Sequence, residues 1–206
     1  KPKALMATLE HANVVALMAG LLTGHKTRLV IREANTPSAS ATKAKSVPAK
    51  SVARLMRWLY PKADGIVAVS EGVANDLSST LAIPQEKVSV ILNPVLTNRD
   101  FELAKAPSPH AWLEDTIPVI LGVGRLTTQK DFPTLIRAFA KVRSQRQARL
   151  LILGEGQDQV ELESLACNLG VASDVHFAGF AENPFAYMAR ASVYVLSSIY
   201  EGLPNA

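Results

Sequence analysis

A glycine turn followed by two cations is the feature of this sequence that is most able to do chemistry. Gly122 and Gly124 lie just before Arg125 and Lys130, at the end of the apolar run 118–123, which predicts a buried strand. Glycine lets a backbone approach an anion closely, a guanidinium can bind two phosphate oxygens, and an ammonium adds a point charge. Because these groups would meet free backbone N–H groups at a strand end, we predict a diphosphate site here.

Other phosphate, dinucleotide and metal sites fit the sequence less well. There is no Gly-Lys-Ser/Thr of a Walker loop, and Gly122-Val-Gly124 lacks the third glycine of a dinucleotide fingerprint, where Thr127 stands. Gly154-Glu155-Gly156 is also incomplete, and a tight turn is its simpler interpretation. Because the sequence has no Asp-x-Asp and no His/Cys cluster with ligand spacing, it predicts no metal site.

The elements that must position the glycine turn are short apolar strands alternating with amphipathic helices. This alternation is typical of parallel sheets flanked by helices, so the expected fold class is α/β with two Rossmann-like parallel-sheet domains. The expected strands are 4–9, 28–32, 65–69, 88–92, 118–123, 149–153, 175–178 and 193–197. The expected helices are 13–23, 52–60, 70–81, one beginning at Asp131 and Pro133, one burying Val160, Leu162, Leu165 and Leu169, and one capped by Asn183. In the helix after Asp131, Leu135, Ile136, Phe139 and Val142 have the spacing of one buried face.

A polar stretch with several prolines divides the chain. We expect a first domain at 1–95, a linker at 96–116 and a second domain at 117–206, and a mobile loop within the first domain at 35–48. The chain does not begin with Met and stops soon after a strand, so we expect a piece of a longer protein in which both domains are incomplete.

Composition narrows the class of protein further. The 206 residues are 48% hydrophobic and 19% charged, with a formal net charge of +4 and no repeated basic-aromatic blocks, so nucleic acid is not an expected partner. No stretch is long and apolar enough to span a bilayer. The only cysteine, Cys167, excludes an internal disulfide, and we expect a buried thiol in the cytoplasm.

Six segments in order resemble the retaining nucleotide-sugar glycosyltransferases of the two-Rossmann-domain (GT-B) type, known as group 1 or family 4. They are Ala68-Val-Ser-Glu71, Ile91-Leu-Asn-Pro-Val95, Val123-Gly-Arg-Leu126 with Lys130 and Asp131, Leu151-Ile-Leu-Gly-Glu-Gly156, Val175-His-Phe-Ala-Gly179 and Ser198-Ile-Tyr-Glu-Gly-Leu-Pro204. None of them is decisive alone, but six in the right order are specific.

The resemblance implies roles for residues of the second domain. Arg125 and Lys130 would hold the donor diphosphate and stabilise the charge that develops as the sugar leaves. Glu201 resembles the first acid of the family's paired-glutamate motif and would contact the donor sugar, with backbone N–H groups around Gly202 and Leu203. The nucleotide site would also include Gly124, Gly154 and the base-reading turn of Gly179 and Phe180. No metal or other cofactor is implied, only a UDP- or GDP-sugar as donor substrate.

The first domain departs from the family pattern. Many relatives place a catalytic histidine after the second strand seen here, where this chain has Arg32 and Glu33. Either residue could contact the acceptor or the sugar, and His11, which follows the first strand, is a further candidate, although a lone histidine is more often structural.

A basic helix in the first domain has two interpretations. Lys43, Lys45, Lys50, Arg54 and Arg57 alternate with apolar residues, which could form a helix that docks on anionic lipid. We favour a helix that covers the sheet, because the same apolar residues are those that a core requires.

The resemblance implies a glycosyltransferase that moves a sugar from a nucleotide diphosphate donor to a glycan or lipid-linked acceptor with retention of configuration. We expect it in polysaccharide biosynthesis, cytoplasmic, with a possible peripheral contact at the inner membrane face, and we expect the 206 residues alone to be inactive. A sugar-nucleotide epimerase, a dinucleotide-binding oxidoreductase with Glu155 on a ribose, and a non-catalytic sugar-nucleotide-binding module remain alternatives.

Overall fold

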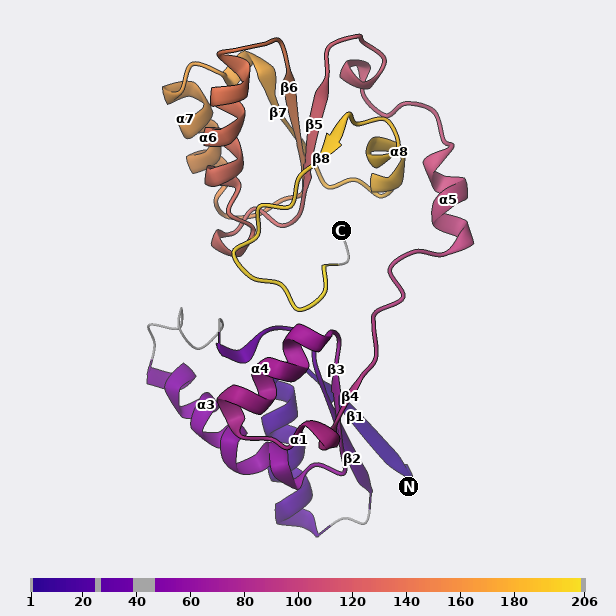
Figure 1. Cartoon of the computed structure of the whole chain (residues 1–206), viewed down its shortest axis with the longest axis vertical. Helices are drawn as coiled ribbons and strands as arrows, with labels where there is room; N and C mark the ends of the chain where they lie inside the picture. The colour runs from indigo at the N-terminus through magenta and orange to yellow at the C-terminus, as the bar shows by residue number, and fades with distance from the viewer. Residues whose placement is uncertain (1, 25–26, 39–46, 205–206) are drawn as a thin grey trace. The chain divides into compact units, whose positions relative to one another are not determined.

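The chain forms two compact α/β units, each built on its own parallel sheet of four strands (Figure 1). The computed structural model describes residues 2–24, 27–38 and 47–204. The first unit comprises Lys1–Asn93 together with Tyr200–Asn205, and the second comprises Pro94–Ile199. The expected α/β class with two parallel-sheet regions is confirmed.

The first sheet has the strands in chain order. They are β1 (Ala4–Thr8), β2 (Arg28–Glu33), β3 (Gly65–Ala68) and β4 (Val88–Val90), each parallel to the next. The register sets Ala7 opposite Ile31, and Ile31 opposite Ile66. Each strand is therefore followed by a connection that returns to the same edge, so the loops after β1, β2 and β3 emerge together.

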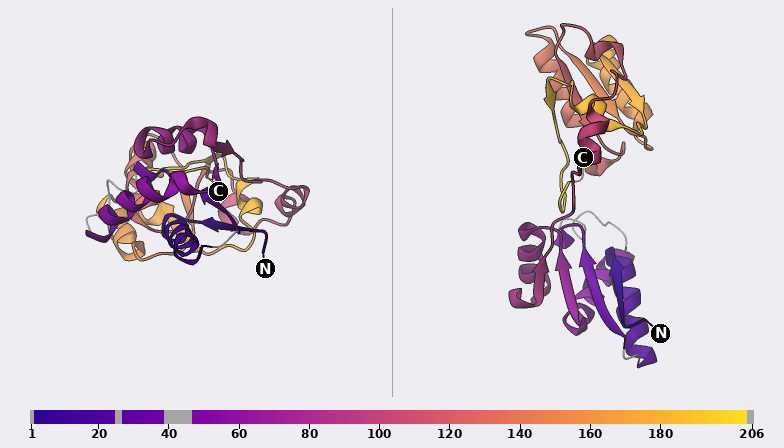
Figure 2. Two further views of the ribbon diagram at one scale, coloured as in Figure 1. Left: turned by 90° about the horizontal axis from the view of Figure 1, so that it is seen from below. Right: turned by 90° about the vertical axis from the view of Figure 1, so that its right-hand side faces the viewer.

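Among the described residues, the helices that pack with this sheet are α1 (Glu10–Thr23), α3 (Val47–Leu59) and α4 (Glu71–Leu81) (Figure 2). The core between them holds the fully buried side chains of Leu17, Ile31, Leu59, Ile66 and Leu77. Gly24 ends α1 in the left-handed conformation, and the hydroxyl of Ser70 accepts the N–H of Val73 at the beginning of α4 at 3.3 Å. The local signals in the sequence therefore placed these helix ends correctly.

The basic helix agrees with the core-covering interpretation as far as it is described. Met56 and Leu59 are buried and Leu55 packs on the core, whereas Arg54 and Arg57 are exposed. Lys43 and Lys45 lie outside the described residues, as does most of the loop expected at 35–48, and the side chain of Lys50 is not described.

The second sheet has the order β7-β6-β5-β8. Its strands are β5 (Val119–Val123), β6 (Arg149–Leu153), β7 (Val175–Gly179) and β8 (Val193–Tyr194). Numbered within this unit, the strands lie side by side in the order third, second, first and fourth. The strand order therefore reverses beside β5. In such sheets ligands bind at the carboxyl ends of the strands around this switch point, which is where the glycine turn lies.

Both faces of the second sheet are covered. Leu150 and Ile152 of β6 face a cluster that includes Phe139 and Leu162, whereas the alternate residues Leu151 and Leu153 belong to a second cluster. The helices are α5 (Asn98–Ala104), α6 (Phe132–Arg143), α7 (Gln159–Asn168) and α8 (Pro184–Met188), with short 3-10 turns at Ala111–Leu113, Thr128–Lys130 and Ala172–Asp174. Burial on both faces explains why β6 reads as a continuous apolar run.

The segment expected to be a linker is folded onto the second unit. Thr97 and Asp100 form a reciprocal capping box that begins α5. The Asn183 side-chain amide donates to the carbonyl of Leu103 at 2.8 Å, and the Arg190 guanidinium donates to the carbonyl of Ala106 at 2.6 Å. The capping box was visible in the sequence, but the partners that hold the segment lie about eighty residues further on.

Other local expectations differ from the structure. The strand expected at 193–197 is only Val193–Tyr194. Val142, Val160 and Leu169, expected to face the core, are 37%, 72% and 40% exposed because the buried faces of α6 and α7 are narrower than the apolar pattern. Cys167, expected to be a buried thiol, is exposed.

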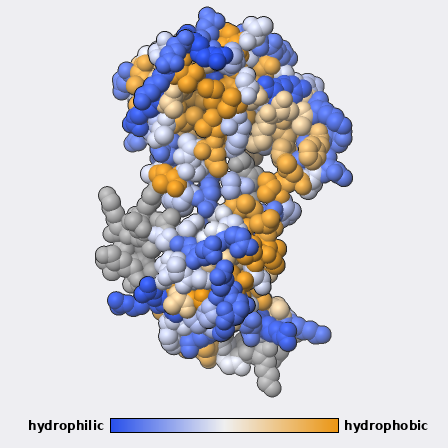
Figure 3. All heavy atoms as spheres, viewed as in Figure 1, coloured by the Kyte–Doolittle hydropathy of each residue, from blue (hydrophilic) through white to orange (hydrophobic). Residues whose placement is uncertain are grey.

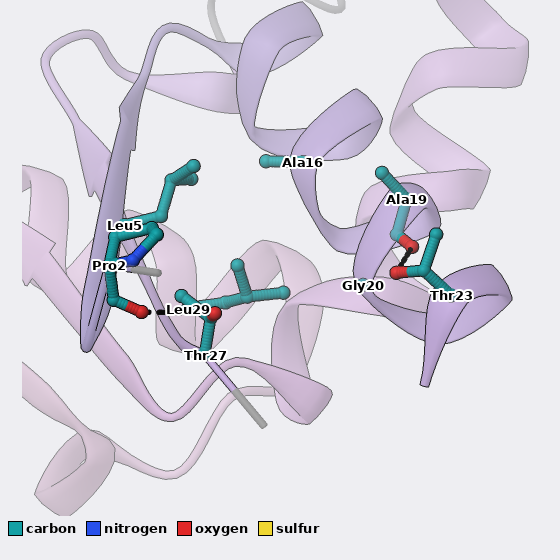
Figure 4. Close-up of a pocket in the computed structure, with 8 residues that line it drawn as sticks. All are labelled: Pro2, Leu5, Ala16, Ala19, Gly20, Thr23, Thr27 and Leu29. Carbon is teal, nitrogen blue, oxygen red and sulfur yellow. Dashed lines mark hydrogen bonds between the residues drawn. The ribbon is translucent and has the colours of Figure 1, made fainter. Parts of the chain in front are cut away.

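The first unit has an apolar groove of about 490 Å³ between β1 and α1 (Figure 4). Leu5, Leu29 and Gly20 are among its lining residues, and large apolar side chains are also exposed elsewhere on both units (Figure 3). The hydroxyls of Thr23 and Thr27 in the groove donate to the carbonyls of Ala19 and Pro2. The groove therefore offers a ligand mainly apolar contact.

Candidate functional site

Three loops of the second unit are joined in a row where β5, β6 and β7 end. The N–H of Gly124 donates to the carbonyl of Leu153 at 2.9 Å, and the N–H of Leu126 donates to the carbonyl of Glu155 at 2.9 Å. The N–H of Gly154 in turn donates to the carbonyl of Gly179 at 2.7 Å. These bonds make one continuous backbone surface from the glycine turn to the turn after β7.

Glycine is required where the first two loops meet. A Cβ added to Gly154 would lie 2.0 Å from the carbonyl oxygen of Gly124, and one added to Gly156 would lie 2.2 Å from that of Leu126. The φ of Gly154, 127°, is also one that other residues rarely adopt. The motif Gly154-Glu155-Gly156 therefore holds the glycine turn in place, a role that its incomplete fingerprint did not indicate.

The joined loops form the wall of a cavity of about 460 Å³. Its lining residues are Val123, Gly124, Arg125, Leu153, Gly154, Glu155, Phe180, Ala181 and Pro184. Four predicted site residues, Gly124, Arg125, Gly154 and Phe180, are thus brought together, and Gly179 is bonded to this wall. Phe180 is 72% exposed, so its ring is available to a ligand.

Lys130 lies beside the same turn. A Cβ added to Gly124 would lie 3.0 Å from both Cδ and Cε of Lys130, so the lysine stem passes directly over this glycine. The carbonyl of Lys130 accepts the hydroxyl of Ser197 at 2.7 Å, and the carbonyl of Gln129 accepts the N–H of Ile199 at 2.9 Å. The segment after β8 therefore fixes the backbone of Lys130. Arg125 and Lys130 lie on the same loop, so both positive charges can act on one ligand.

This arrangement suits a diphosphate. Arg125 is exposed at the cavity wall, the Lys130 stem covers Gly124, and α6 begins directly after Asp131. Charge-assisted bonds from such groups contribute roughly 1.5–3 kcal/mol each. Together they can offset the charge that develops on a departing diphosphate, with little rearrangement of the loop.

Glu201, Gly202 and Leu203 lie in the first unit. The hydroxyl of Thr36 donates to the carbonyl of Glu201 at 3.1 Å, and the hydroxyl of Ser70 donates to that of Gly202 at 2.7 Å. Leu203 packs on the core of that unit. The structure does not group these residues with the cavity loops, so their contact with a donor sugar remains a prediction.

The three candidates of the first unit have different surroundings. His11 is exposed on the first turn of α1, and the Arg32 guanidinium donates to Asn93 Oδ1. Glu33, which was given with Arg32 as a residue that could contact the acceptor or the sugar, is fully buried. Its Oε2 accepts the hydroxyl of Tyr60 at 2.8 Å and the side-chain amide of Asn13 at 3.4 Å.

Burial raises the pKa of Glu33 from 4.5 to about 7, against the Tyr60 and Asn13 hydrogen bonds, which lower it. The nearby Glu10 carboxylate adds to the increase. Asn13 Nδ2 also donates to Tyr60 Oη at 3.2 Å and to the carbonyl of Arg32 at 3.1 Å, so the network joins α1 to the end of β2. Asn13 and Tyr60 were missed at the sequence level, although a polar residue inside an apolar helix face was a usable signal for Asn13.

The raised pKa makes the stability of this fold depend on pH. Because folded Glu33 holds its proton at pH values where the unfolded chain has lost it, the free energy of unfolding should fall as pH rises from about 4.5 to about 7. The loss is about 3 kcal/mol from this group, and it should be complete above that window. Denaturant unfolding should show that the free energy of unfolding of Glu33→Gln increases relative to that of wild type as the pH rises across this range. A difference that is constant with pH would contradict the assignment.

Metal ligands and membrane spans give no further site among the residues that the structure describes. Within that part of the chain, no group of three or more His, Cys, Asp and Glu side chains could hold a metal ion. No helix there is long and apolar enough to cross a membrane.

The fold and the loop geometry define a class, a pair of Rossmann-like units of which the second has a cavity at its strand ends with Arg125 on its wall and Lys130 beside it. Two family models match the chain, "Glycosyltransferase Family 4" at residues 7–99 and "Glycosyl transferases group 1" at residues 109–206. The chain belongs to the group 1 glycosyltransferases.

Curated relatives share this family. The chain is 36% identical over 200 residues to the N-acetylgalactosamine-N,N'-diacetylbacillosaminyl-diphospho-undecaprenol 4-alpha-N-acetylgalactosaminyltransferase of Campylobacter jejuni, covering 96% of this chain and 52% of that protein. It is 33% identical over 148 residues to the lipopolysaccharide core biosynthesis glycosyltransferase LpsE of Rhizobium meliloti, covering 71% of this chain and 41% of that protein. The chain thus spans about half the length of these relatives or less.

Solved structures show the same fold. Anabaena HepE in complex with UDP-glucose superposes with a TM-score of 0.74 at 20% identity, over 95% of this chain and 53% of that one. Sucrose-phosphate synthase from Thermosynechococcus elongatus superposes with a TM-score of 0.73 at 17% identity, over 98% of this chain and 52% of that one. These likenesses establish the GT-B fold.

Proposed function

We propose that the protein transfers a sugar from a nucleoside diphosphate donor to an acceptor, with retention of anomeric configuration. The observation that carries the proposal is the cavity at the strand ends of the second unit, with Arg125 on its wall and the Lys130 stem over Gly124. A diphosphate is the leaving group that this pair of cations best stabilises.

Each end of the donor has a proposed partner. The diphosphate lies against Gly124, Arg125, Lys130 and Gly154, and the base lies at the Gly179–Phe180 turn, where the exposed ring and backbone groups are available. Glu201 and the backbone of Gly202 and Leu203 contact the donor sugar. In this scheme Arg125 and Lys130 stabilise the departing diphosphate, and no metal or other cofactor is required.

The donor and acceptor classes rest on the relatives. Anabaena HepE was solved with UDP and with UDP-glucose, which supports a UDP-sugar, with a GDP-sugar as the second candidate. The Campylobacter jejuni relative is named for a diphospho-undecaprenol acceptor, which supports a lipid-linked glycan and a role in polysaccharide biosynthesis. Such an acceptor favours a cytoplasmic protein with peripheral contact at the inner membrane face. His11 and Arg32 are its proposed contacts in the first unit.

The other classes have less support. An oxidoreductase needs a dinucleotide site, and the fingerprint at Gly122-Val-Gly124 lacks its third glycine. A sugar-nucleotide epimerase of the same fold would change the configuration of the sugar without forming a product with an acceptor. A non-catalytic binding module would bind a sugar nucleotide without breaking its glycosidic bond.

The test is an assay of the intact protein with UDP-, GDP- and ADP-sugars and a lipid-linked glycan. We expect release of one nucleoside diphosphate together with a glycosylated product, whose anomeric configuration NMR can compare with that of the donor. Inversion would contradict retention, and tight binding without any release would favour the binding module.

Chelation tests the metal-free mechanism. We expect sugar transfer to survive EDTA, because Arg125 and Lys130 supply the positive charge that a divalent ion would otherwise bring to a diphosphate. The comparison is the initial rate with EDTA and with added magnesium or manganese. Complete loss of transfer on chelation, restored by the metal, would show that these two cations do not suffice.

A further inference from the structure

Residues 200–204 belong to the first unit, where the loops after the neighbouring strands β2 and β3 hold them. Thr36 lies in the loop after β2, and its hydroxyl donates to the carbonyl of Glu201 at 3.1 Å. Ser70 follows β3, and its hydroxyl donates to the carbonyl of Gly202 at 2.7 Å. Two neighbouring loops therefore bind two consecutive carbonyls of this segment.

A close contact fixes the same segment further. A Cβ added to Gly202 would lie 2.0 Å from the carbonyl oxygen of Ala34 and 3.1 Å from Cα of Asn35, so this contact requires glycine. The next residue, Leu203, packs on the core of the first unit. The main chain that carries the Glu201 side chain is therefore held by hydrogen bonds, by close contact and by apolar packing.

The two hydroxyls are oriented by contacts of their own. The oxygen of Ser70 accepts the N–H of Val73 at 3.3 Å while its O–H donates to Gly202, so this hydroxyl is donor and acceptor at once. Thr36 precedes the buried Pro37, and a residue before proline is restricted to extended conformations. Little conformational freedom is thus left to lose when these residues bind the segment.

Both hydroxyls bind main-chain carbonyls, so neither of these bonds involves the carboxylate of Glu201. The bonds set the place where the side chain begins and leave its chemistry unchanged. A carboxylate that accepts hydrogen bonds from a sugar needs such support, because a misplacement of about 1 Å can lower a rate about 100-fold. On an unsupported loop, each substrate would have to order the carboxylate at a cost in binding free energy.

We propose that Thr36 and Ser70 are positioning residues, which hold the main chain of Glu201 and Gly202 so that the Glu201 carboxylate meets the hydroxyls of the donor sugar. The first unit thereby contributes to the selection of the sugar, although the proposed nucleotide contacts lie in the second unit. The proposal rests on the proposed function, because it places the donor sugar at Glu201.

The first experiment measures sugar transfer by the intact protein with the UDP-, GDP- or ADP-sugar that supports it, and titrates the matching nucleoside diphosphate by calorimetry. Thr36→Val keeps the β-branched shape and removes the hydroxyl. It should lower kcat/KM for the nucleotide sugar about 10-fold or more and leave the Kd of the nucleoside diphosphate unchanged. Ser70→Ala should do the same, although it also removes the cap of α4. Thr36→Ser and Ser70→Thr, which keep the hydroxyls, should behave like wild type.

The second experiment asks whether the two hydroxyls act through Glu201. Glu201→Gln should itself lower transfer, because an amide oxygen is a weaker acceptor than a carboxylate. Adding Thr36→Val to Glu201→Gln should then cost much less than Thr36→Val costs in wild type, since the effects of residues that share one interaction are not additive. The matched control is Thr80→Val, which removes a half-buried hydroxyl that donates to Asp76 within α4 and should keep full transfer.

The outcomes separate this role from a structural one. Loss of nucleoside diphosphate binding in Thr36→Val, in step with the loss of transfer, would overturn the proposal. Losses of transfer by Thr36→Val and Glu201→Gln that simply add would overturn it as well. If wild type transfers no sugar from any of these donors, the proposed function itself fails. If wild type transfers a sugar and Thr36→Val does so equally well, only the positioning role fails.

Discussion

Arg125→Ala and Lys130→Ala should each lower the rate of sugar transfer by about 100-fold or more, with little change in stability. The reason is that both cations act on charge that develops only as the diphosphate leaves, so their loss raises the barrier more than it weakens ground-state binding. Lys130→Met is the sharper variant, because it keeps much of the apolar stem that covers Gly124 and removes only the charge.

The controls for this prediction are Arg137→Ala and Lys141→Ala, two exposed cations of α6 outside the cavity. They should keep nearly full turnover, and all five proteins should unfold at similar denaturant concentrations. Near-normal turnover in Lys130→Met and Arg125→Ala would remove the two cations from the mechanism.

Gly154→Ala should destabilise the second unit by about 4 kcal/mol or more and abolish nucleotide binding. The added methyl would lie 2.0 Å from the carbonyl oxygen of Gly124, so the loops after β5 and β6 must separate. That separation breaks the bonds that form the cavity wall, and a loss of this size indicates a specific structural clash.

Gly170→Ala is the matched control, since Gly170 also has a positive φ, 70°, but no atom lies within 4 Å of its added Cβ. Gly170→Ala should lower the free energy of unfolding only by the backbone strain, about 1–2 kcal/mol. Denaturant unfolding of the two variants separates strain from collision. Equal losses would show that the close approach of the two loops contributes nothing to stability.

Much of the fold was predictable because its signals are local. Apolar runs such as 149–153 marked strands buried on both faces, and Ser70, Gly24 and Pro133 marked helix ends within a residue or two. The parallel pairing of the strands follows from the helices that connect them, because parallel neighbours need a crossover connection.

The site could be predicted in part for the same reason. Arg125 and Gly124 follow a strand whose end lies at the switch point, so topology alone brings them to the cavity. That Gly154 holds the glycine turn in place was not predictable, because this contact depends on the distance between two loops about thirty residues apart.

Glu33 shows where reading along the chain fails. A charged residue at a strand end suggests a ligand contact, but its burial depends on Asn13 and Tyr60, which reach it from α1 and from the turn after α3. These polar groups come together only in the folded protein, so no local sequence pattern predicts their contacts. The same holds for α5, whose partners Asn183 and Arg190 lie far along the sequence.

The measurement that tests the central claim most directly is calorimetric titration of the protein with UDP, GDP, NAD and NADP under identical conditions. We predict that UDP or GDP binds in the cavity of the second unit and that neither dinucleotide gives measurable heat. The reason is that the glycine turn offers two cations to a terminal diphosphate but lacks the third glycine of a dinucleotide site. Tight binding of NAD or NADP, with no binding of either nucleoside diphosphate, would contradict the account.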